Sequence, residues 1–211
     1  MEAPIKENLA AGIIKLSGWE PGQAFLDPMC GSGTFLIEAA LIATNQAPGL
    51  KRNFGFMAWK NFDKALFKDI KKSYQNAIIQ KDFLRIYGSD KDLRAVRVSK
   101  KNLVLAGFEN CIQLACKQFN EIKPPLDEGV LVTNPPYGER IGDDEDLDNA
   151  YPDWARTLKQ SFAGWSTYFL TNDFRMPKLM RLAPSKKTPL FNGALDCRLF
   201  EIKMVAGSNR K

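Results

Sequence analysis

Short apolar runs of strand length alternate with helix-like segments along the 211-residue chain, and this alternation constrains the fold most. Strands that alternate with helices form a mostly parallel sheet covered by helices, an α/β architecture. In such sheets ligands bind beyond the carboxyl ends of the strands. The expected strands are 24–26, 85–87, 111–114, 129–133, 166–171 and 198–204, and the expected helices are 34–43, 92–106, 153–162 and 175–182.

The composition predicts one domain over residues 1–211, because a hydrophobic content of 45% in a chain of this length supports one sizeable core. Gly107 directly after Ala106 predicts a helix end at that point. Histidine is absent, which excludes Ser-His-Asp and Cys-His catalysis and nearly all catalytic zinc sites. We expect no metal.

The four cysteines form no C-x-x-C pair, and we expect them to be reduced thiols. The amino terminus lacks a signal-peptide pattern, and no apolar run approaches the roughly 20 residues that span a bilayer. We therefore expect a cytoplasmic protein without a membrane segment.

The net charge of +6 comes from one stretch. Residues 51–101 hold 14 Lys and Arg against 5 Asp and Glu, and aromatic residues are interleaved with the charges. This composition suits RNA, through phosphate contacts and base stacking. The alternative is an amphipathic helix with a solvated lysine face and an aromatic core face. An acidic run, Asp143, Asp144, Glu145, Asp146 and Asp148, is expected to be a solvated loop.

The first chemical motif is a glycine-rich turn between an apolar strand and an apolar helix. Gly31 and Gly33 allow a tight turn and a close approach of a ligand to the backbone, and the helix that follows offers free N–H groups. The spacing fits neither a dinucleotide fingerprint nor a P-loop. Asp27, ahead of the glycines, suits a ligand with an ammonium group or hydroxyls, such as S-adenosylmethionine (SAM). The predicted cofactor-binding residues here are Asp27, Pro28, Cys30, Gly31, Ser32, Gly33 and Thr34.

The second motif is Gly88-Ser89-Asp90, which follows the strand predicted to end at Tyr87. An acid at a strand end can accept two hydrogen bonds from ribose hydroxyls. The alternative is that Asp90 or Ser89 caps the following helix. We favour the ribose role for Asp90.

The third motif, Asn134-Pro135-Pro136-Tyr137, directly follows the strand 129–133. Two consecutive prolines force the chain out of the sheet. The carboxamide oxygen of Asn134 and the carbonyl of Pro135 are then acceptors for the two N–H groups of an exocyclic amine. Tyr137 offers a face on which a base can stack. Asn134, Pro135 and Tyr137 are the predicted catalytic residues, and Asn134 is also expected beside the cofactor.

The sequence resembles the class I SAM-dependent methyltransferases of the N-P-P-Y branch. It is most similar to the bacterial large-subunit ribosomal RNA guanine-N2 methyltransferases of the THUMP-associated kind (RlmL-type). The resemblance rests on DPMCGSGTFLIEAA at 27–40 and NPPYGER at 134–140. Weaker matches are the segments 3–11, 47–50, 54–56, 88–90 and 190–193.

This resemblance implies a Rossmann-like, seven-stranded, mostly parallel sheet whose last strand is antiparallel. It implies SAM as cofactor, large-subunit rRNA as partner and the N2 amine of a guanine as target. It also implies that the segment around residues 4–7 packs beside SAM. Family members carry an amino-terminal THUMP region that this chain is expected to lack, and residues 45–84 are expected to be a basic, aromatic insert.

One site residue follows from the resemblance by position alone. The strand after Gly107 is expected to end near an acceptor for the adenine amino group of SAM, and counting back from Ile122 gives Gln118. A plain surface glutamine is the alternative.

Other functions left open are methylation of adenine N6 in DNA, methylation of guanine N2 in tRNA, and an RNA-binding module that holds SAM without catalysis.

Overall fold

The computed structural model of the chain describes residues 5–136 and 147–207. Its central feature is a seven-stranded sheet with the strand order β3-β2-β1-β4-β5-β7-β6. In chain order the elements are α1 (Glu7–Leu16), β1 (Ala24–Asp27), α2 (Thr34–Ala43), η1 (Gly55–Ala58), α3 (Lys64–Asn76), β2 (Ile86–Asp90), α4 (Leu93–Ala106), β3 (Gln113–Cys116), η2 (Phe119–Glu121), β4 (Gly129–Thr133), α5 (Leu147–Ser161), β5 (Trp165–Thr171), α6 (Met176–Met180), β6 (Lys186–Asn192) and β7 (Leu195–Lys203).

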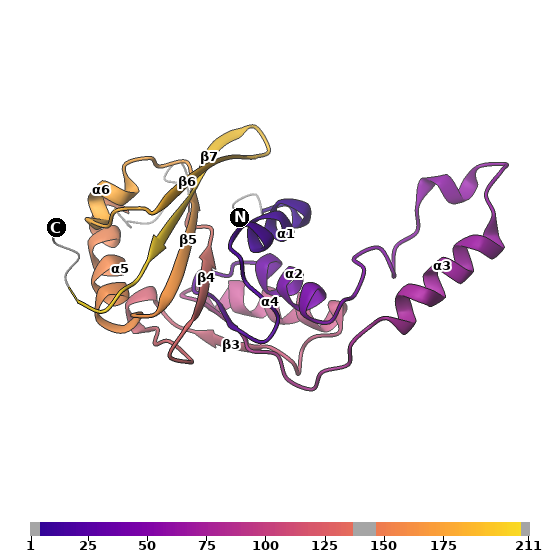
Figure 1. The fold of residues 1–211 in the computed structure, drawn as a ribbon, viewed down its shortest axis with the longest axis horizontal. Coiled ribbons are helices and arrows are strands. Elements are labelled where there is room, and N and C mark those ends of the chain that lie inside the picture. The colour runs from indigo at the N-terminus through magenta and orange to yellow at the C-terminus, as the bar shows by residue number, and fades with distance from the viewer. Residues whose placement is uncertain (1–4, 137–146, 208–211) are drawn as a thin grey trace.

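The sheet confirms the expected class. Strands β3, β2, β1, β4 and β5 pair in parallel, and β7 pairs antiparallel with β5 and β6. Alternate residues of each central strand face opposite layers. On β1, for example, Phe25 packs with α1 and α2, whereas Leu26 packs with α5 and α6. The sheet is thus sandwiched between two helical layers (Figure 1).

Several element boundaries differ from the sequence prediction. Helix α5 begins at Leu147 instead of Asp153, which brings Asp148 of the acidic run into a helix and not a loop. Residues 143–146 of that run lie outside the described residues. Strand β2 continues to Asp90, so this acid is the last residue of the strand. Helix α4 ends at Ala106, and Gly107 takes the left-handed conformation with φ 87°, as predicted.

The sequence prediction lacked helix α1 and strand β6, as well as the short helices η1 and η2. Helix α1 packs against α2, and its inward residues Ala10, Ile13 and Ile14 are buried. Strand β6 is an edge strand with mostly exposed side chains and a proline, Pro189, so its apolar signal is weak. The two-residue connection after Asn192 turns the chain directly into β7.

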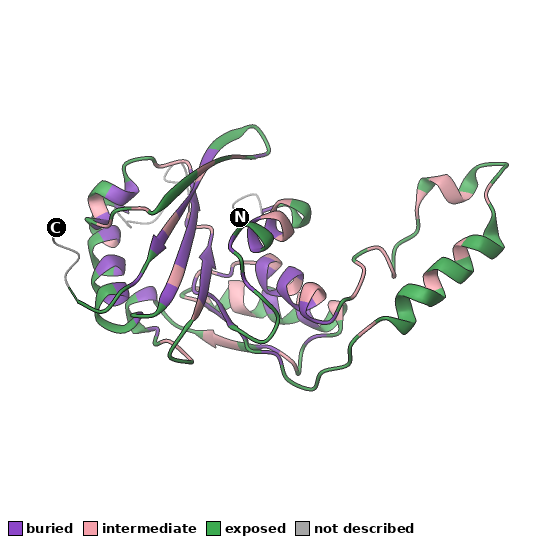
Figure 2. Cartoon of the chain, in the orientation of Figure 1, coloured by how far each residue is buried: buried purple, intermediate pink, exposed green. Residues whose placement is uncertain are grey.

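The segment between α2 and β2 extends away from the sheet and its helices (Figure 1). Helix α3 lies in this segment and contains no buried residue (Figure 2). The prediction of a solvated lysine face over Lys64, Lys68, Lys71 and Lys72 is confirmed, since Lys71 is half-buried and the other three are exposed. The accompanying prediction of an aromatic core face is wrong, because no residue of this helix is buried.

No helix in residues 5–136 and 147–207 combines the length and the apolarity needed to cross a bilayer.

Candidate active site

A cavity of about 810 Å³ lies at the carboxyl ends of β1, β2 and β4. The chain runs from β1 to β2 and β3 on one side and to β4 and β5 on the other, so the strand order reverses at β1. Nine of the predicted site residues line this cavity, and Gly33 and Pro135 lie next to lining residues. The nine are Asp27, Pro28, Cys30, Gly31, Ser32, Thr34, Asp90, Gln118 and Asn134.

The loop between β1 and α2 forms one wall of the cavity. Gly31 has φ 52° and Gly33 has φ 83°, a conformation that favours glycine. A side chain on Gly31 would meet nothing within 4 Å, so its backbone borders open space. A Cβ on Gly33 would come within 3.1 Å of the Ser99 hydroxyl. Gly31 therefore gives a ligand access to the backbone, whereas Gly33 lets the loop pack against α4.

Asp90 joins this loop to the end of β2. Its carboxylate accepts a hydrogen bond from the Gly31 N–H at 2.9 Å and another from the Asp92 N–H at 2.9 Å. The residue that caps α4 is Asp92, whose carboxylate accepts from the Arg94 N–H. The alternative that Asp90 or Ser89 caps this helix is therefore wrong. Each carboxylate oxygen has two lone pairs, so Asp90 retains capacity for a ligand hydroxyl.

Two polar side chains of α4 donate hydrogen bonds to carbonyls of this loop. The Ser99 hydroxyl donates to the Gly31 carbonyl at 2.7 Å, and the Asn102 carboxamide donates to the Ser32 carbonyl at 2.9 Å. Sequence reasoning missed both residues. Their spacing of three residues places both on one face of the helix, and this spacing is the sequence signal that could have identified them as a pair.

The loop's own side chains are also tied down. The Cys30 thiol lies 3.6 Å from the Ser99 hydroxyl, and burial raises its pKa, so this cysteine stays a neutral thiol. The hydroxyls of Ser32 and Thr34 are 3.1 Å apart. These contacts fix the loop before any ligand arrives.

Asp27 couples the loop to β4. This side chain is 1% exposed, and its carboxylate accepts from the Thr133 hydroxyl at 2.9 Å and from the Met29 N–H at 3.2 Å. Burial raises the pKa of Asp27 from 3.8 to about 7. Thr133, also missed from the sequence, is buried directly before Asn134. The Asp27–Thr133 bond therefore links the end of β1 to the start of the N-P-P-Y motif.

The N-P-P-Y motif leaves the sheet at the end of β4, as two consecutive prolines require. Asn134 and Pro136 line the cavity, and Pro135 between them is buried. Tyr137 lies outside the described residues. Asn134 thus lies on the same cavity as Asp90, two strands away across β1.

Gln118, which lies between β3 and η2, also lines the cavity. It precedes the short helix η2 as its N-cap, and its backbone N–H donates to the Glu121 carboxylate at 2.9 Å. Its neighbour Asn120 lines the cavity as well. Both side chains are exposed, so the position fits an acceptor for a ligand as well as a surface glutamine.

The cavity has apolar walls around this polar floor. They come from Ile5 before α1 and from side chains of α2, α4, η2 and α5, and they can hold a flat ring. These apolar residues are Ile5, Phe35, Val98, Phe119 and Trp154.

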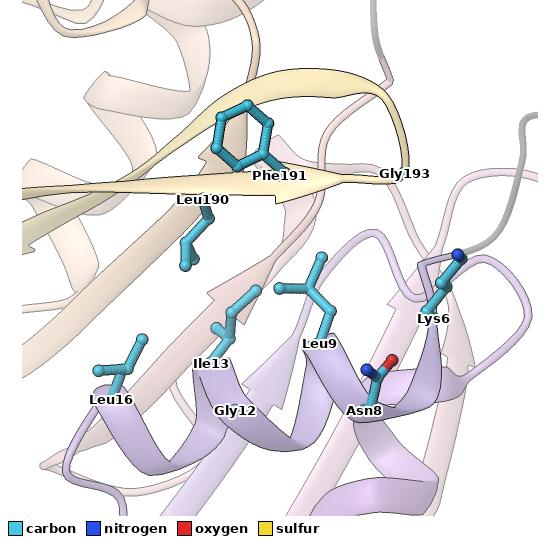
Figure 3. A pocket seen from close by; sticks show the side chains of 9 residues that line it. All are labelled: Lys6, Asn8, Leu9, Gly12, Ile13, Leu16, Leu190, Phe191 and Gly193. Atoms are coloured by element: carbon cyan, nitrogen blue, oxygen red, sulfur yellow. The ribbon is translucent and has the colours of Figure 1, made fainter.

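A second, smaller cavity of about 380 Å³ lies between α1 and the β6–β7 hairpin (Figure 3). Leu190 of β6 points toward Leu9 and Ile13 of α1 across it, and Lys6 is its one charged lining residue. This lining offers little to orient a reacting group, and none of the predicted site residues lies there. The larger cavity is therefore the candidate active site.

Comparison with known proteins agrees with this architecture. Residues 1–201 match the RMKL-like methyltransferase domain family. The chain belongs to this family. Among curated relatives of the methyltransferase domain, the ribosomal RNA large subunit methyltransferase K/L of Shewanella sp. (strain W3-18-1) is 41% identical over 215 residues. The protein of the same name from Shewanella baltica (strain OS185) is 40% identical. Each alignment covers all of this chain and 30% of the relative, so the chain spans about a third of their length.

Solved structures of similar methyltransferase domains have the same fold. SMU.472, crystallised with S-adenosylhomocysteine (SAH), is 39% identical with a TM-score of 0.91, and the match covers 99% of this chain and 55% of that one. A predicted N6-adenine-specific DNA methylase from Listeria monocytogenes str. 4b F2365 is 34% identical with a TM-score of 0.87, covering 97% of this chain and 52% of that one.

Proposed function

We propose that this methyltransferase domain transfers the methyl group of SAM to the exocyclic N2 amine of a guanine in large-subunit ribosomal RNA. One observation carries the proposal: the Gly31 loop, Asp90 and Asn134 converge on a single cavity at the switch point of the sheet. The name of the two relatives from Shewanella, which specifies large-subunit ribosomal RNA, supports the substrate class.

The residues present fit SAM. Gly31 leaves open space for a ligand, because a Cβ there would meet no atom, while its N–H and carbonyl are bonded to Asp90 and Ser99. Asp90 offers carboxylate oxygens for ribose hydroxyls. The apolar side chains of Phe35, Val98 and Phe119 can enclose the adenine ring. Gln118 is the proposed acceptor for the adenine amino group, and Asp27 faces the methionine end.

The base is held by the N-P-P-Y motif in this proposal. The Asn134 carboxamide oxygen and the Pro135 carbonyl accept the two N–H groups of the guanine amine, and Tyr137 stacks on the ring. Accepting both hydrogens directs the nitrogen lone pair out of conjugation with the ring. When bound, SAM would supply an electrophilic methyl group. The amine nitrogen would bond to the methyl carbon as the carbon–sulfur bond breaks in line, and S-adenosylhomocysteine would leave. Catalysis then comes from positioning and from the two acceptors.

A proton must leave the methylated amine, and water suffices to accept it, because the positively charged nitrogen is strongly acidic. The chain contains no histidine that could act as a base near neutral pH. Asn134 therefore acts as an orienting acceptor and not as a base. We place the reaction in the cytoplasm, in keeping with four free cysteines among the described residues.

A transfer assay tests the proposal. The purified chain is incubated with methyl-tritiated SAM and unmethylated large-subunit rRNA, and the RNA is digested to nucleosides and separated. We expect the label in N2-methylguanosine. Label in another nucleoside would overturn the target base, and unlabelled RNA from a protein that binds SAM would overturn the substrate.

Methylation of adenine N6 is the second candidate. It is favoured by the 34% identical structure described as a predicted N6-adenine-specific DNA methylase. The amines of adenine and guanine present the same two hydrogens, so the acceptor pair serves either base. In duplex DNA the base would first have to leave the stack. The same assay with single-stranded and duplex DNA, and with unmethylated tRNA, separates these substrates.

A further inference from the structure

Residues 45–83 form an arm that projects from the domain between α2 and β2 (Figure 1). Every one of these residues is described, and each is exposed or half-buried (Figure 2). The arm leaves where α2 ends and returns where β2 begins. Its two legs are joined by hydrogen bonds from the Ile79 N–H to the Thr44 carbonyl and from the Asn45 carboxamide to the Ala77 carbonyl.

The arm keeps its shape through a small aromatic cluster of its own. Phe56 stacks on Phe54 with ring centroids 5.2 Å apart, and contacts Phe62 and Phe67 at 5.8 Å each. Phe62 and Phe67 are 5.5 Å apart, which fastens α3 to the preceding turn. The arm is therefore a defined structure and not a loose loop.

Several apolar side chains of the arm are exposed, including that of Trp59, whose ring lies edge-on to Phe56 at 6.4 Å. On α3, Leu66, Ile70 and Tyr74 are 44–58% exposed, and Trp59 is 73% exposed. Exposed apolar groups gathered in this way mark an interaction surface. The lysines Lys64, Lys68 and Lys72 occupy the other side of the helix. The arm thus presents both ring faces and cations.

Charge identifies the partner. The arm holds eight Lys and Arg against three Asp and Glu, whereas the whole chain has a net charge of +6, so most of the excess charge lies here. An apolar protein surface would not require this charge, whereas a polyanion with exposed bases matches both features. We propose that the arm is a second RNA-binding surface of this methyltransferase domain. This inference rests on the proposed function.

The topology separates the arm from the catalytic cavity. Helices α2 and α4 run back from the carboxyl edge of the sheet, so their last residues lie at the amino edge. The arm is rooted there, and Lys51 of the arm donates to the Ala106 carbonyl at the end of α4. A strand such as β4, Gly129–Thr133, spans about 15 Å. The arm therefore holds RNA remote from the target base and contributes affinity without touching the reacting atoms.

The test compares two triple variants that carry the same charge change. One is Lys64→Glu, Lys68→Glu, Lys72→Glu on the arm. The matched control is Lys15→Glu, Lys123→Glu, Lys186→Glu, on exposed positions of the domain. Filter binding with unmethylated large-subunit rRNA at several salt concentrations gives the RNA affinity, and calorimetry with SAH gives the cofactor affinity. Both variants are expected to bind SAH as the unaltered protein does.

We expect the arm variant to bind this RNA roughly tenfold or more weakly and with a smaller salt dependence, because phosphate contacts are lost. Its KM for RNA should rise while kcat at saturating RNA is unchanged. In RNA affinity, KM and kcat, the control variant should stay within about twofold of the unaltered protein, as expected for lysines that make no specific phosphate contact. Equal RNA affinity in the arm variant, or equal weakening in the control, would overturn the inference.

A further variant keeps the test decisive for the apolar side. Trp59→Ala should weaken RNA binding without a change in sedimentation, as a lost stacking contact predicts. Sedimentation tests the alternative of a protein interface. If the unaltered protein sediments as a dimer, Leu66→Ser with Ile70→Ser converts it to a monomer, and the lysine variant binds RNA normally, the arm is a protein interface and the inference is wrong.

These outcomes are separable from failure of the proposed function. Arm-dependent RNA binding without methyl transfer to rRNA would overturn the proposed reaction and leave the arm as an RNA-binding surface. Methyl transfer with an unchanged KM in the arm variant would overturn the arm and leave the reaction standing.

Discussion

At the scale of single residues, Asp90 and Asn134 stand at the ends of strands on either side of β1 and face one cavity. Their surroundings assign them different tasks. Asp90 is tied to the glycine-rich loop by its bond from the Gly31 N–H. Asn134 directly follows the buried Thr133, which is fixed by Asp27. We therefore expect substitutions at the two positions to affect cofactor binding and turnover separately.

Asn134→Ala should lower kcat by roughly 100- to 1,000-fold, since it removes the side-chain acceptor that we propose holds the reacting amine. The affinity for SAM, measured by calorimetry, should change less than about twofold, because the loop and Asp90 are untouched. Asn110→Ala on an exposed turn is the control and should leave both unchanged. Turnover in Asn134→Ala comparable to the unaltered protein would refute the catalytic assignment.

Asp90→Asn should weaken cofactor binding and largely spare turnover, the reverse of the effect expected for Asn134→Ala. It removes one charged acceptor that the Gly31 N–H and the ribose would share, and we expect SAM affinity to fall roughly 10- to 100-fold. At saturating SAM, kcat should be largely retained. Asp127→Asn, exposed and remote, serves as control. Calorimetry that returns an unchanged dissociation constant would exclude the ribose role.

Asp27 makes stability depend on pH. Its pKa rises from 3.8 to about 7 on folding, so the folded chain binds more protons than the unfolded chain between these values. Stability is therefore lost as the pH rises from about 4 to about 7 and is level above that. Asp27→Asn keeps the acceptor for Thr133 but cannot ionise.

Urea unfolding at pH 5 and pH 8 measures this effect. Relative to Asp27→Asn, the unaltered protein should lose about 2 to 3 kcal/mol of unfolding free energy between the two pH values. Glu38, whose pKa burial also raises to about 7, is present in both proteins and cancels in the comparison. An equal pH dependence of the two proteins would show that Asp27 ionises normally.

At the scale of elements, the contact that bears most on the cofactor site is the packing of α4 against the glycine-rich loop. Gly33→Ala would force a left-handed φ of 83° on alanine and press its Cβ to 3.1 Å from the Ser99 hydroxyl. We expect a loss of about 1–2 kcal/mol in unfolding free energy, together with weaker SAM binding.

Gly18→Ala is the matched control for this change. Gly18 also has a left-handed φ, 69°, but a Cβ there meets nothing within 4 Å. The control should lose similar stability through strain alone and bind SAM normally. If Gly33→Ala also bound SAM normally, the packing of α4 would not shape the cofactor site.

The same elements explain what the sequence could predict. Helix α2 and strand β4 were predicted residue for residue, because each is a largely apolar run, with Gly33 directly before α2 and the N-P-P-Y prolines after β4. Because ligands bind beyond the carboxyl ends of parallel strands, the sequence also predicted that Asp27, Asp90 and Asn134 lie at one edge of the sheet. Edge strand β6 gave no such signal, and the supporting bonds of Ser99, Asn102 and Thr133 join residues far apart in sequence. Such contacts depend on the tertiary fold.

At the scale of the whole molecule, two features lie at opposite edges of one sheet. The cavity occupies the carboxyl edge, and the basic arm is rooted at the amino edge. A substrate that reaches both must be larger than a nucleotide, which fits a folded RNA better than a free base. We therefore propose that this chain methylates guanine N2 in large-subunit rRNA, with Asn134 as the residue that orients the amine.

Nucleoside mass spectrometry of purified large-subunit rRNA tests that claim most directly. RNA from the source cell is compared with RNA from a strain that lacks the gene encoding this chain. We expect the loss of about one N2-methylguanosine per RNA, as for a site-specific enzyme that orients a single target amine. The intact gene should restore it, and the Asn134→Ala gene should not. An unchanged amount of N2-methylguanosine, or full restoration by Asn134→Ala, would contradict the account.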